Sequence, residues 1–185
     1  MKKKVYVFLA DGFEEIEAIT PLDVLRRAEI ETVSVSISST KRVTGAHGIT
    51  VEADVLLTEL NIADADLIVL PGGMPGTKNL AECQLLLDTV LAHAQAGKLT
   101  AAICAAPSIL GMLDLLKGKE ATCFPGWEDK LTGALYDKVP CIVDGNIVTS
   151  RGPGTAMEFS MRLVELLTDA TTASELARRM IVTRL

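Results

Sequence analysis

The stretch LTAAICAAPSILGMLDLL, residues 99–116, decides how this chain is organised. Its first residues, 99–103, have the composition of a short buried strand, and the apolar spacing becomes helical after Cys104. Pro107 suits the first turn of a helix, because its missing N–H is not needed there. We therefore predict a strand that turns sharply into a helix at Cys104, which is the geometry of a nucleophile elbow.

A thiol at such a turn lies beside a helix amino terminus. Backbone N–H groups and partial positive charge favour the thiolate there, so we expect the pKa of Cys104 to fall below the ~8.5 of a free cysteine. The alternative is a structural cysteine buried in an apolar run. We first expect Cys83, Cys123 and Cys141 to be packing residues. The four cysteines lack metal-ligand spacing, so no metal site is expected, and their place in apolar segments suits reduced thiols in the cytoplasm.

Size and charge limit the function classes. The chain has 185 residues, so we predict one domain spanning 1–185. Its formal net charge is −6 and no basic stripe follows the amino-terminal lysines, which argues against nucleic acid as a partner. No apolar run reaches the ~18 residues of a membrane span, and acidic residues directly follow the first apolar run, which argues against a secretory signal.

Working outward, strands alternate with helices. Apolar runs predict strands at 4–10, 32–37, 65–70, 99–103, 121–124, 140–144 and 146–150, the last two forming a tight pair. A small hairpin is predicted over 43–55, and helices over 13–28, 79–96, 107–116, 155–167 and 172–183. We expect the first helix to bury Ile16, Ile19, Leu22 and Leu25 and to be interrupted at Pro21. This alternation predicts an α/β parallel sheet covered by helices on both faces.

In open α/β sheets the functional site lies beyond the carboxyl ends of the strands. Four predicted strand ends carry unusual residues and should meet at one edge: Asp11-Gly12, Pro71-Gly72-Gly73, Cys104, and the loop 150–155. Bare N–H groups at Gly72 and Gly73 can form an oxyanion hole, although a simple turn is the plainer interpretation.

Acidic residues at the start of the first helix have two interpretations. Glu14, Glu15 and Glu17 can simply complement the helix dipole. Alternatively, one carboxyl faces the sheet edge and shares a proton with the Cys104 thiolate, because two adjacent anions repel. The spacing brings neither His47 nor His93 to the cysteine, so we expect both to be satisfied or solvated.

The sequence resembles the DJ-1/ThiJ/PfpI superfamily, and within it the branch of small stress-response proteins. The segments that carry the resemblance occur in family order and are DGFEEIEA (11–18), LPGG (70–73), AAICAAP (101–107) and SRGPGT (150–155). The resemblance implies a flavodoxin-like sheet, no cofactor, and a homodimer whose partner packs near the active site.

The resemblance also implies roles for individual residues. Cys104 matches the family nucleophile, Glu17 the carboxylic acid that hydrogen-bonds it, and the N–H groups of Gly73 and Ala105 the anion-binding backbone. Positions expected to line the pocket or the dimer contact are Glu14, His47, Phe124, Arg151, Gly152, Pro153 and Gly154.

Two positions depart from the family pattern. Protease-like relatives have His directly after the cysteine, where this chain has Ala105, so a Cys–His protease is not expected. Other relatives place a His before the proline at 125, where this chain has Phe124. Proton transfer is then expected to depend on Glu17 and water.

Three functions follow as hypotheses. The first is glyoxalase or deglycase chemistry, in which the Cys104 thiolate adds to methylglyoxal or to early glycation adducts and Glu17 moves protons. The second is a redox-sensing holding chaperone that works through oxidation of Cys104. The third, thiazole monophosphate biosynthesis, has only the loop 152–154 before a helix as a possible anion cradle.

Overall fold

A seven-stranded sheet forms the centre of the protein, of which the computed structural model describes residues 2–182. The strand order is β10-β11-β7-β6-β1-β2-β5, and every neighbouring pair is parallel except β10–β11. The strands span Lys4–Leu9 (β1), Glu31–Ser36 (β2), Val55–Leu56 (β5), Leu67–Leu70 (β6), Leu99–Ile103 (β7), Cys141–Asp144 (β10) and Ile147–Ser150 (β11). The predicted mostly parallel α/β sheet is confirmed.

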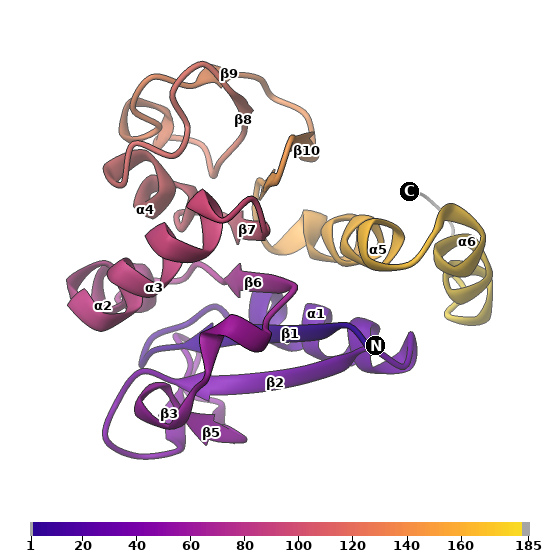
Figure 1. Cartoon of the computed structure of the whole chain (residues 1–185), viewed down its shortest axis with the longest axis horizontal. Helices are drawn as coiled ribbons and strands as arrows, with labels where there is room; N and C mark the ends of the chain where they lie inside the picture. Colours follow the sequence, from indigo (N-terminus) through magenta and orange to yellow (C-terminus); the bar gives the residue numbers. More distant parts are fainter. Residues whose placement is uncertain (1, 183–185) are drawn as a thin grey trace.

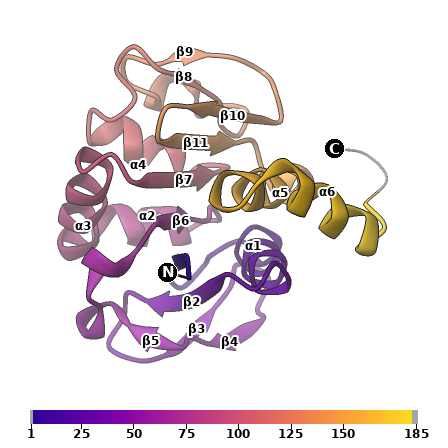
Figure 2. The same ribbon diagram turned by 45° about the vertical axis from the view of Figure 1, so that its right-hand side comes forward.

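Helices cover both faces of this sheet (Figure 1). One layer contains α1 (Glu15–Arg27), α5 (Ala156–Leu167) and α6 (Ala170–Arg179), and the other contains α2 (Gly76–Glu82), α3 (Gln84–Gln95) and α4 (Pro107–Met112). Figure 2 shows α3 and α4 on one side of the strands and α1, α5 and α6 on the other. The fold is therefore the sandwich that the continuous apolar strands predict.

Alternation along the strands creates two separate hydrophobic cores. In β1, Val5, Val7 and Leu9 pack with the α1–α5–α6 layer. Tyr6 and Phe8 of the same strand face the α2–α3–α4 layer, because successive side chains point to opposite faces of a sheet. The central strands are thus buried on both faces.

Two small sheets flank the main one. The predicted hairpin is formed by β3 (Arg42–Thr44) and β4 (Thr50–Glu52), and a short parallel pair joins β8 (Glu120–Ala121) to β9 (Leu135–Tyr136). Short 3-10 helices span Leu57–Glu59, Ile62–Asp64, Glu128–Lys130 and Pro153–Thr155. The strand predicted over 121–124 is therefore wrong in extent, because only Ala121 of that range pairs.

The predicted buried face of α1 is partly wrong. Ile16 and Ile19 are 52% and 39% exposed, whereas Leu22 and Leu25 are buried. The buried stripe runs through Ala18, Leu22 and Leu25, positions four and three apart that face the sheet and α5. The helix also continues through Pro21 rather than ending there.

Three other predicted helices differ in extent. The last, predicted over 172–183, is α6 at Ala170–Arg179, and residue 183 lies outside the described residues. The helix predicted over 79–96 is divided at Cys83, whose extended backbone ends α2 and precedes α3. The helix predicted over 107–116 ends at Met112, and Asp114 then adopts a left-handed conformation with φ of 59°. α4 is therefore only six residues long.

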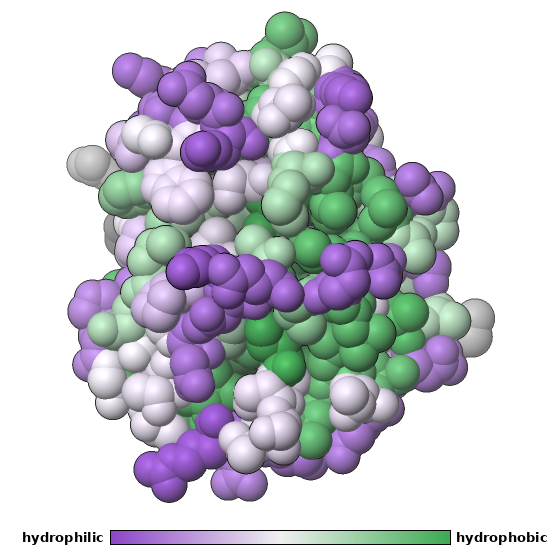
Figure 3. All heavy atoms as spheres, turned by 90° about the vertical axis from the view of Figure 1, so that its left-hand side faces the viewer, coloured by the Kyte–Doolittle hydropathy of each residue, from purple (hydrophilic) through white to green (hydrophobic). Residues whose placement is uncertain are grey.

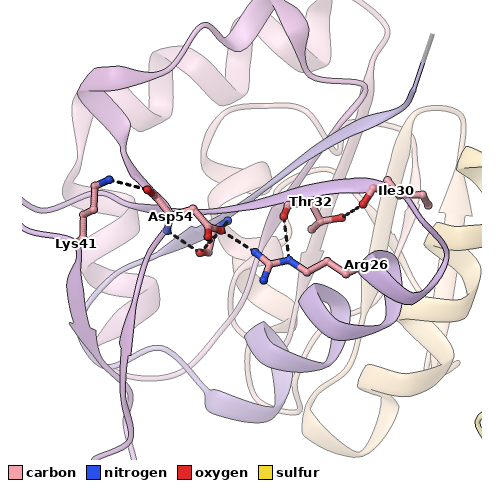
Figure 4. Close-up of polar contacts among 6 residues, drawn as sticks. Arg26, Ile30, Thr32, Lys41 and Asp54 are labelled. Carbon is pink, nitrogen blue, oxygen red and sulfur yellow. Dashed lines mark hydrogen bonds and ion pairs between the residues drawn. The ribbon is translucent and has the colours of Figure 1, made fainter.

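Polar contacts tie the end of α1 to the edge of the sheet (Figure 4). Asp54 Oδ2 accepts hydrogen bonds from Arg26 Nη2 and from the Ser34 N–H, each at 2.7 Å. Arg26 Nε also donates to the Thr32 carbonyl at 3.0 Å, and Lys41 Nζ donates to the Asp54 carbonyl at 2.7 Å. This cluster therefore links the last turn of α1 to β2 and to the residue before β5.

Figure 3 shows hydrophobic side chains in two areas of one face, with a hydrophilic band crossing between them. That face is therefore mixed in character. Of the helices described within residues 2–182, none is both long and apolar enough to cross a membrane.

Candidate active site

Four neighbouring strands bring the predicted site together. β11, β7, β6 and β1 are adjacent in the sheet and parallel, so their carboxyl ends lie along one edge. The residues that follow those ends are the loop 151–155, Cys104, Pro71-Gly72-Gly73 and Asp11-Gly12. Segments far apart in the sequence thus meet where a parallel sheet usually carries its site.

Cys104 occupies a strained turn directly after β7. Its φ is +67°, a left-handed conformation that costs a non-glycine residue about 1–3 kcal/mol and is kept only where the surroundings enforce it. The Cys104 N–H donates to the Ser150 carbonyl at 2.9 Å, and its carbonyl accepts from the Phe124 N–H at 2.8 Å. The half-buried sulfur is thus held in place by backbone contacts on both sides.

Glu17, in the first turn of α1, places its carboxyl beside this sulfur. The side chain is fully buried, and its Oε2 accepts a hydrogen bond from the Gly72 N–H at 2.9 Å. Among the residues that the structure describes, Oε1 has no hydrogen-bond partner. The Glu14 N–H, at the start of the helix, donates to the Gly72 carbonyl at 2.9 Å and so fixes α1 against the end of β6.

A side chain at position 72 would not fit, because Cys104 and the Glu17 carboxyl fill the space beside Gly72. A Cβ on Gly72 would lie 2.6 Å from Glu17 Oε2 and 3.1 Å from Cys104 Sγ. Gly73 has φ of +92°, and a Cβ there would collide with the backbone before α1. Both glycines are therefore required by close approach. The Gly72 N–H already donates to Glu17, so the predicted role of Gly72 as an oxyanion donor is not available in this arrangement.

Replacing Gly72 by alanine is accordingly expected to displace Glu17 or Cys104. We expect at least a tenfold loss of any activity that depends on the pair, together with a lower melting temperature, because the added methyl group overpacks the site. Gly154→Ala is the matched control, since its Cβ would meet nothing within 4 Å. Equal losses in the two variants, measured by activity and thermal unfolding, would disprove this packing.

The protonation of the pair differs from the sequence prediction. Burial raises the pKa of Glu17 to about 7, against the opposing effect of hydrogen bonds with Cys104 and the Gly72 N–H. Burial, followed by the charge of Glu17, raises the pKa of the Cys104 thiol to about 12. The prediction of a lowered thiol pKa is therefore wrong, because the N–H groups of Ala105 and Gly73 act in the predicted direction but are outweighed.

These two pKa values belong to the pair as a whole. The pair loses one proton near pH 7 and retains the other up to about pH 12. Between these values one proton is shared, and the sulfur is anionic whenever Glu17 carries it. Any thiolate in this range is therefore the form of the pair in which Glu17 holds the shared proton.

A second cluster, formed by Glu14, Glu15 and His47, holds the β3–β4 hairpin against α1. Glu15 Oε1 accepts from the His47 N–H at 2.7 Å, and Glu15 Oε2 lies 2.8 Å from His47 Nδ1. Glu14 Oε2 is 3.5 Å from the same ring nitrogen. One potential metal-ligand atom from each residue lies within 4.8 Å of the others, but these atoms already partner one another.

The charges of this cluster respond to one another. Burial opposes ionisation of Glu15, but hydrogen bonds from His47 and from backbone N–H groups prevail and lower the pKa of its carboxyl. The hydrogen bond to Glu15 raises the pKa of His47, and the charge of Glu14 adds to this effect. Sequence reasoning missed the structural role of Glu15, since nothing in its spacing indicates a contact 32 positions away.

His93 is a satisfied core residue, as predicted. It is 4% exposed, and its Nε2 lies 3.0 Å from the Leu99 carbonyl oxygen. Cys123 is fully buried, in agreement with a packing role, whereas Cys83 and Cys141 are half-buried.

Phe124 and the loop after β11 border the Glu17 carboxyl. A Cβ on Gly152 would lie 3.1 Å from Phe124 Cδ2 and 3.9 Å from Glu17 Oε1, so the ring and the free oxygen face the same position. The charge of Arg151, from the same loop, lowers the pKa of Cys123 and Tyr136 against the burial that raises both.

The loop itself offers fewer free donors than the sequence suggests. The N–H groups of Arg151 and Gly152 both donate to Thr155 Oγ1, at 3.2 and 3.1 Å. Pro153, which begins the following 3-10 helix, has no N–H to offer. The expected anion cradle at 152–154 is therefore occupied by the protein's own threonine, a contact that sequence reasoning did not identify.

Known proteins are similar to this chain in sequence and in architecture. The DJ-1/PfpI family model matches residues 3–166. The chain is 43% identical to DJ-1 homolog B of Arabidopsis thaliana over 95% of its length, but it spans only 40% of that protein and 45% of homolog A. It is 34% identical to the Caenorhabditis elegans protein named glutathione-independent glyoxalase DJR-1.2, with 90% of this chain and 89% of that protein covered. Oxidized DJ-1 of Toxoplasma gondii has a TM-score of 0.94 and 36% identity, covering 98% of this chain and 100% of that one. The chain therefore belongs to the DJ-1/PfpI family.

Proposed function

We propose that this protein is a cofactor-independent glyoxalase-type enzyme, with Cys104 as the nucleophile and Glu17 as the acid and base. The observation that carries the proposal is the carboxyl of Glu17, which is fully buried beside the half-exposed sulfur and whose Oε1 has no hydrogen-bond partner within residues 2–182. A relative that is named a glyoxalase supports the reaction class. The substrates are 2-oxoaldehydes such as methylglyoxal, and the same addition would act on glycated side chains.

The first step uses the shared proton of the pair. The Cys104 thiolate attacks the aldehyde carbon, the new S–C bond forms, and the former carbonyl oxygen takes the proton from Glu17. The product is a hemithioacetal beside an ionised Glu17. The backbone N–H groups of Gly73 and Ala105, which lower the pKa of the sulfur, also counter negative charge as it develops.

Rearrangement and hydrolysis complete the reaction. Glu17 takes the proton from C1 and returns it to C2, while the hydroxyl proton on O1 moves to O2. C1 is oxidised and C2 is reduced in this isomerisation, which yields the thioester of a 2-hydroxy acid. Water then breaks the C–S bond, so that methylglyoxal and water give lactate and the free thiol.

The direct test is chiral analysis of lactate formed from methylglyoxal by the purified protein. A single enantiomer formed at a rate proportional to protein concentration is the expected result. Racemic lactate at the rate of the protein-free solution would refute the proposal.

A redox sensor that acts as a holding chaperone is the second candidate. Its specific support is the half-exposed sulfur with nearby N–H donors, together with a solved relative, Toxoplasma gondii DJ-1, that is described as oxidized. Oxidation of the thiolate to sulfinate adds two oxygens from peroxide, and the same donors would stabilise the anion.

Peptide mass spectrometry after graded peroxide treatment tests this candidate. We expect Cys104 to reach the sulfinate before the half-buried Cys83 and Cys141, because Cys104 alone shares a proton with an adjacent carboxyl. Cys123, which is fully buried, serves as the internal control. Oxidation of Cys83 or Cys141 ahead of Cys104 would contradict a sensor role.

We further propose that two copies associate through the outer face of α1 and that the protein works in the cytoplasm. Ile16 and Ile19 lie on one exposed face of this helix, at 52% and 39% exposure. Ile49, 57% exposed, belongs to the hairpin that Glu15 holds against the same helix. Exposed apolar side chains grouped in this way commonly mark a protein interface.

A further inference from the structure

We infer that Phe124 determines substrate selectivity, by providing an aromatic surface for the substituent of a 2-oxoaldehyde, so that aromatic and branched substituents are preferred to methyl or anionic ones. The inference rests on the proposed glyoxalase function and adds the class of substrate. It starts from an exposed aromatic ring and an unpartnered buried oxygen that border one position.

Backbone hydrogen bonds tie the main chain of Phe124 to the elbow and to the turn that follows. The Phe124 N–H donates to the Cys104 carbonyl at 2.8 Å, and the Phe124 carbonyl accepts from the Trp127 N–H at 3.1 Å. The main chain of Phe124 is thus hydrogen-bonded to the residue that carries the sulfur.

Gly152 leaves the space in which the ring lies. The φ of Gly152 is 164°, an extended conformation open to any residue, so backbone geometry does not require glycine there. A Cβ would instead lie 3.1 and 3.5 Å from Phe124 Cδ2 and Cε2, and 3.9 Å from Glu17 Oε1. The missing side chain therefore lets the ring approach the free oxygen of the catalytic carboxyl.

This juxtaposition specifies what a substrate needs. The reacting carbon bonds to Cys104 Sγ, and a substrate oxygen supplies the hydrogen-bond partner that Glu17 Oε1 lacks. The ring, 43% exposed, is the apolar surface beside that oxygen and receives the remaining substituent. Aromatic pairs gain from ring contact beyond simple burial, while the neighbouring carboxylates repel an anionic group.

The test compares phenylglyoxal with methylglyoxal. We expect the wild-type kcat/KM to favour phenylglyoxal by about tenfold, in line with the size of hydrophobic pocket discrimination. Phe124→Ala should reduce that ratio to near one, and Phe124→Leu should retain part of it. Leu135→Ala, at a site 62% exposed on β9, is the control and should leave the ratio unchanged.

A binding measurement separates this inference from the proposed function. Titration calorimetry with mandelate and lactate, the products of the two aldehydes, requires no turnover. Tighter binding of mandelate in the wild type, lost in Phe124→Ala, supports the inference even where neither aldehyde is converted. If both aldehydes are converted but Phe124→Ala leaves the substrate ratio and the binding difference unchanged, the inference is overturned while the glyoxalase function stands.

Discussion

Replacing Cys104 by serine is expected to reduce enzymatic conversion of methylglyoxal by at least about a thousandfold, to the rate of the protein-free solution. A serine hydroxyl at this position is far less nucleophilic than a thiolate, and Glu17, with a pKa of about 7, is too weak a base to ionise it. The strained turn and its hydrogen bonds to Ser150 and Phe124 involve only the backbone, so the variant should keep the wild-type fold. Lactate formation and thermal unfolding, measured on the same preparation, check both statements.

Cys83→Ser is the matched control for that experiment. Cys83 is half-buried at the break between α2 and α3. Its replacement should leave lactate formation within about twofold of the wild type. If Cys104→Ser retained wild-type turnover, or if Cys83→Ser lost it to the same degree, Cys104 would not be the nucleophile.

Replacing Glu17 by glutamine is expected to lower the rate by about 10²–10⁴-fold, which is the usual contribution of a positioned acid or base. The amide keeps the shape of the side chain and can still accept from the Gly72 N–H, but it cannot take the proton from C1. In the wild type the rate should rise through an inflection near pH 7, where the pair loses its first proton. The measurement is the rate as a function of pH for the wild type and Glu17→Gln, with Glu175→Gln on α6 as the control.

Although Glu17→Gln is expected to lower the rate, it should raise the stability of the folded protein above neutral pH. The pKa of Glu17 is raised in the folded protein, so the folded state binds this proton more tightly than the unfolded chain. Stability is therefore lost as the pH rises from about 4.5 through about 7, by on the order of 3 kcal/mol. Glu17→Gln should melt higher than the wild type at pH 8 and lose that advantage below pH 4.5. If Glu17→Gln were less stable than the wild type at pH 8, the ionised Glu17 carboxylate would not be the destabilising buried charge that this account requires.

The architecture could be predicted from the sequence because each strand carries its own signal. The apolar run 99–103 matches β7 residue for residue, and the pair 140–150 became the antiparallel β10–β11. The meeting of four strand ends follows from parallel strands in one sheet. These features depend on local hydrophobic periodicity, which a single sequence contains.

Features that depend on contacts across the fold could not be predicted in this way. Both the spacing and the apolar character of Ile16 and Ile19 suit a buried stripe, but α1 is turned so that Ala18 and Glu17 face inward instead. The thiol pKa depends on how deeply Cys104 and Glu17 are buried together, which the helix-terminus argument omits. The contact of Glu15 with the β3–β4 hairpin and that of Phe124 with Gly152 join residues about 30 positions apart.

The shared proton of Cys104 and Glu17 is tested most directly by the rate at which iodoacetamide alkylates Cys104 as a function of pH, read by mass spectrometry of the peptide that contains it. Alkylation requires the thiolate, which forms when the pair loses its first proton. Burial raises the pKa of both Cys104 and Cys141 to about 12, but the causes that act on Cys104 include a hydrogen bond with a carboxyl, that of Glu17, whereas those that act on Cys141 do not. We therefore predict an inflection near pH 7 for Cys104 and no such step for Cys141. A Cys104 rate that shows no step near pH 7 and rises only above pH 9 would contradict the shared proton.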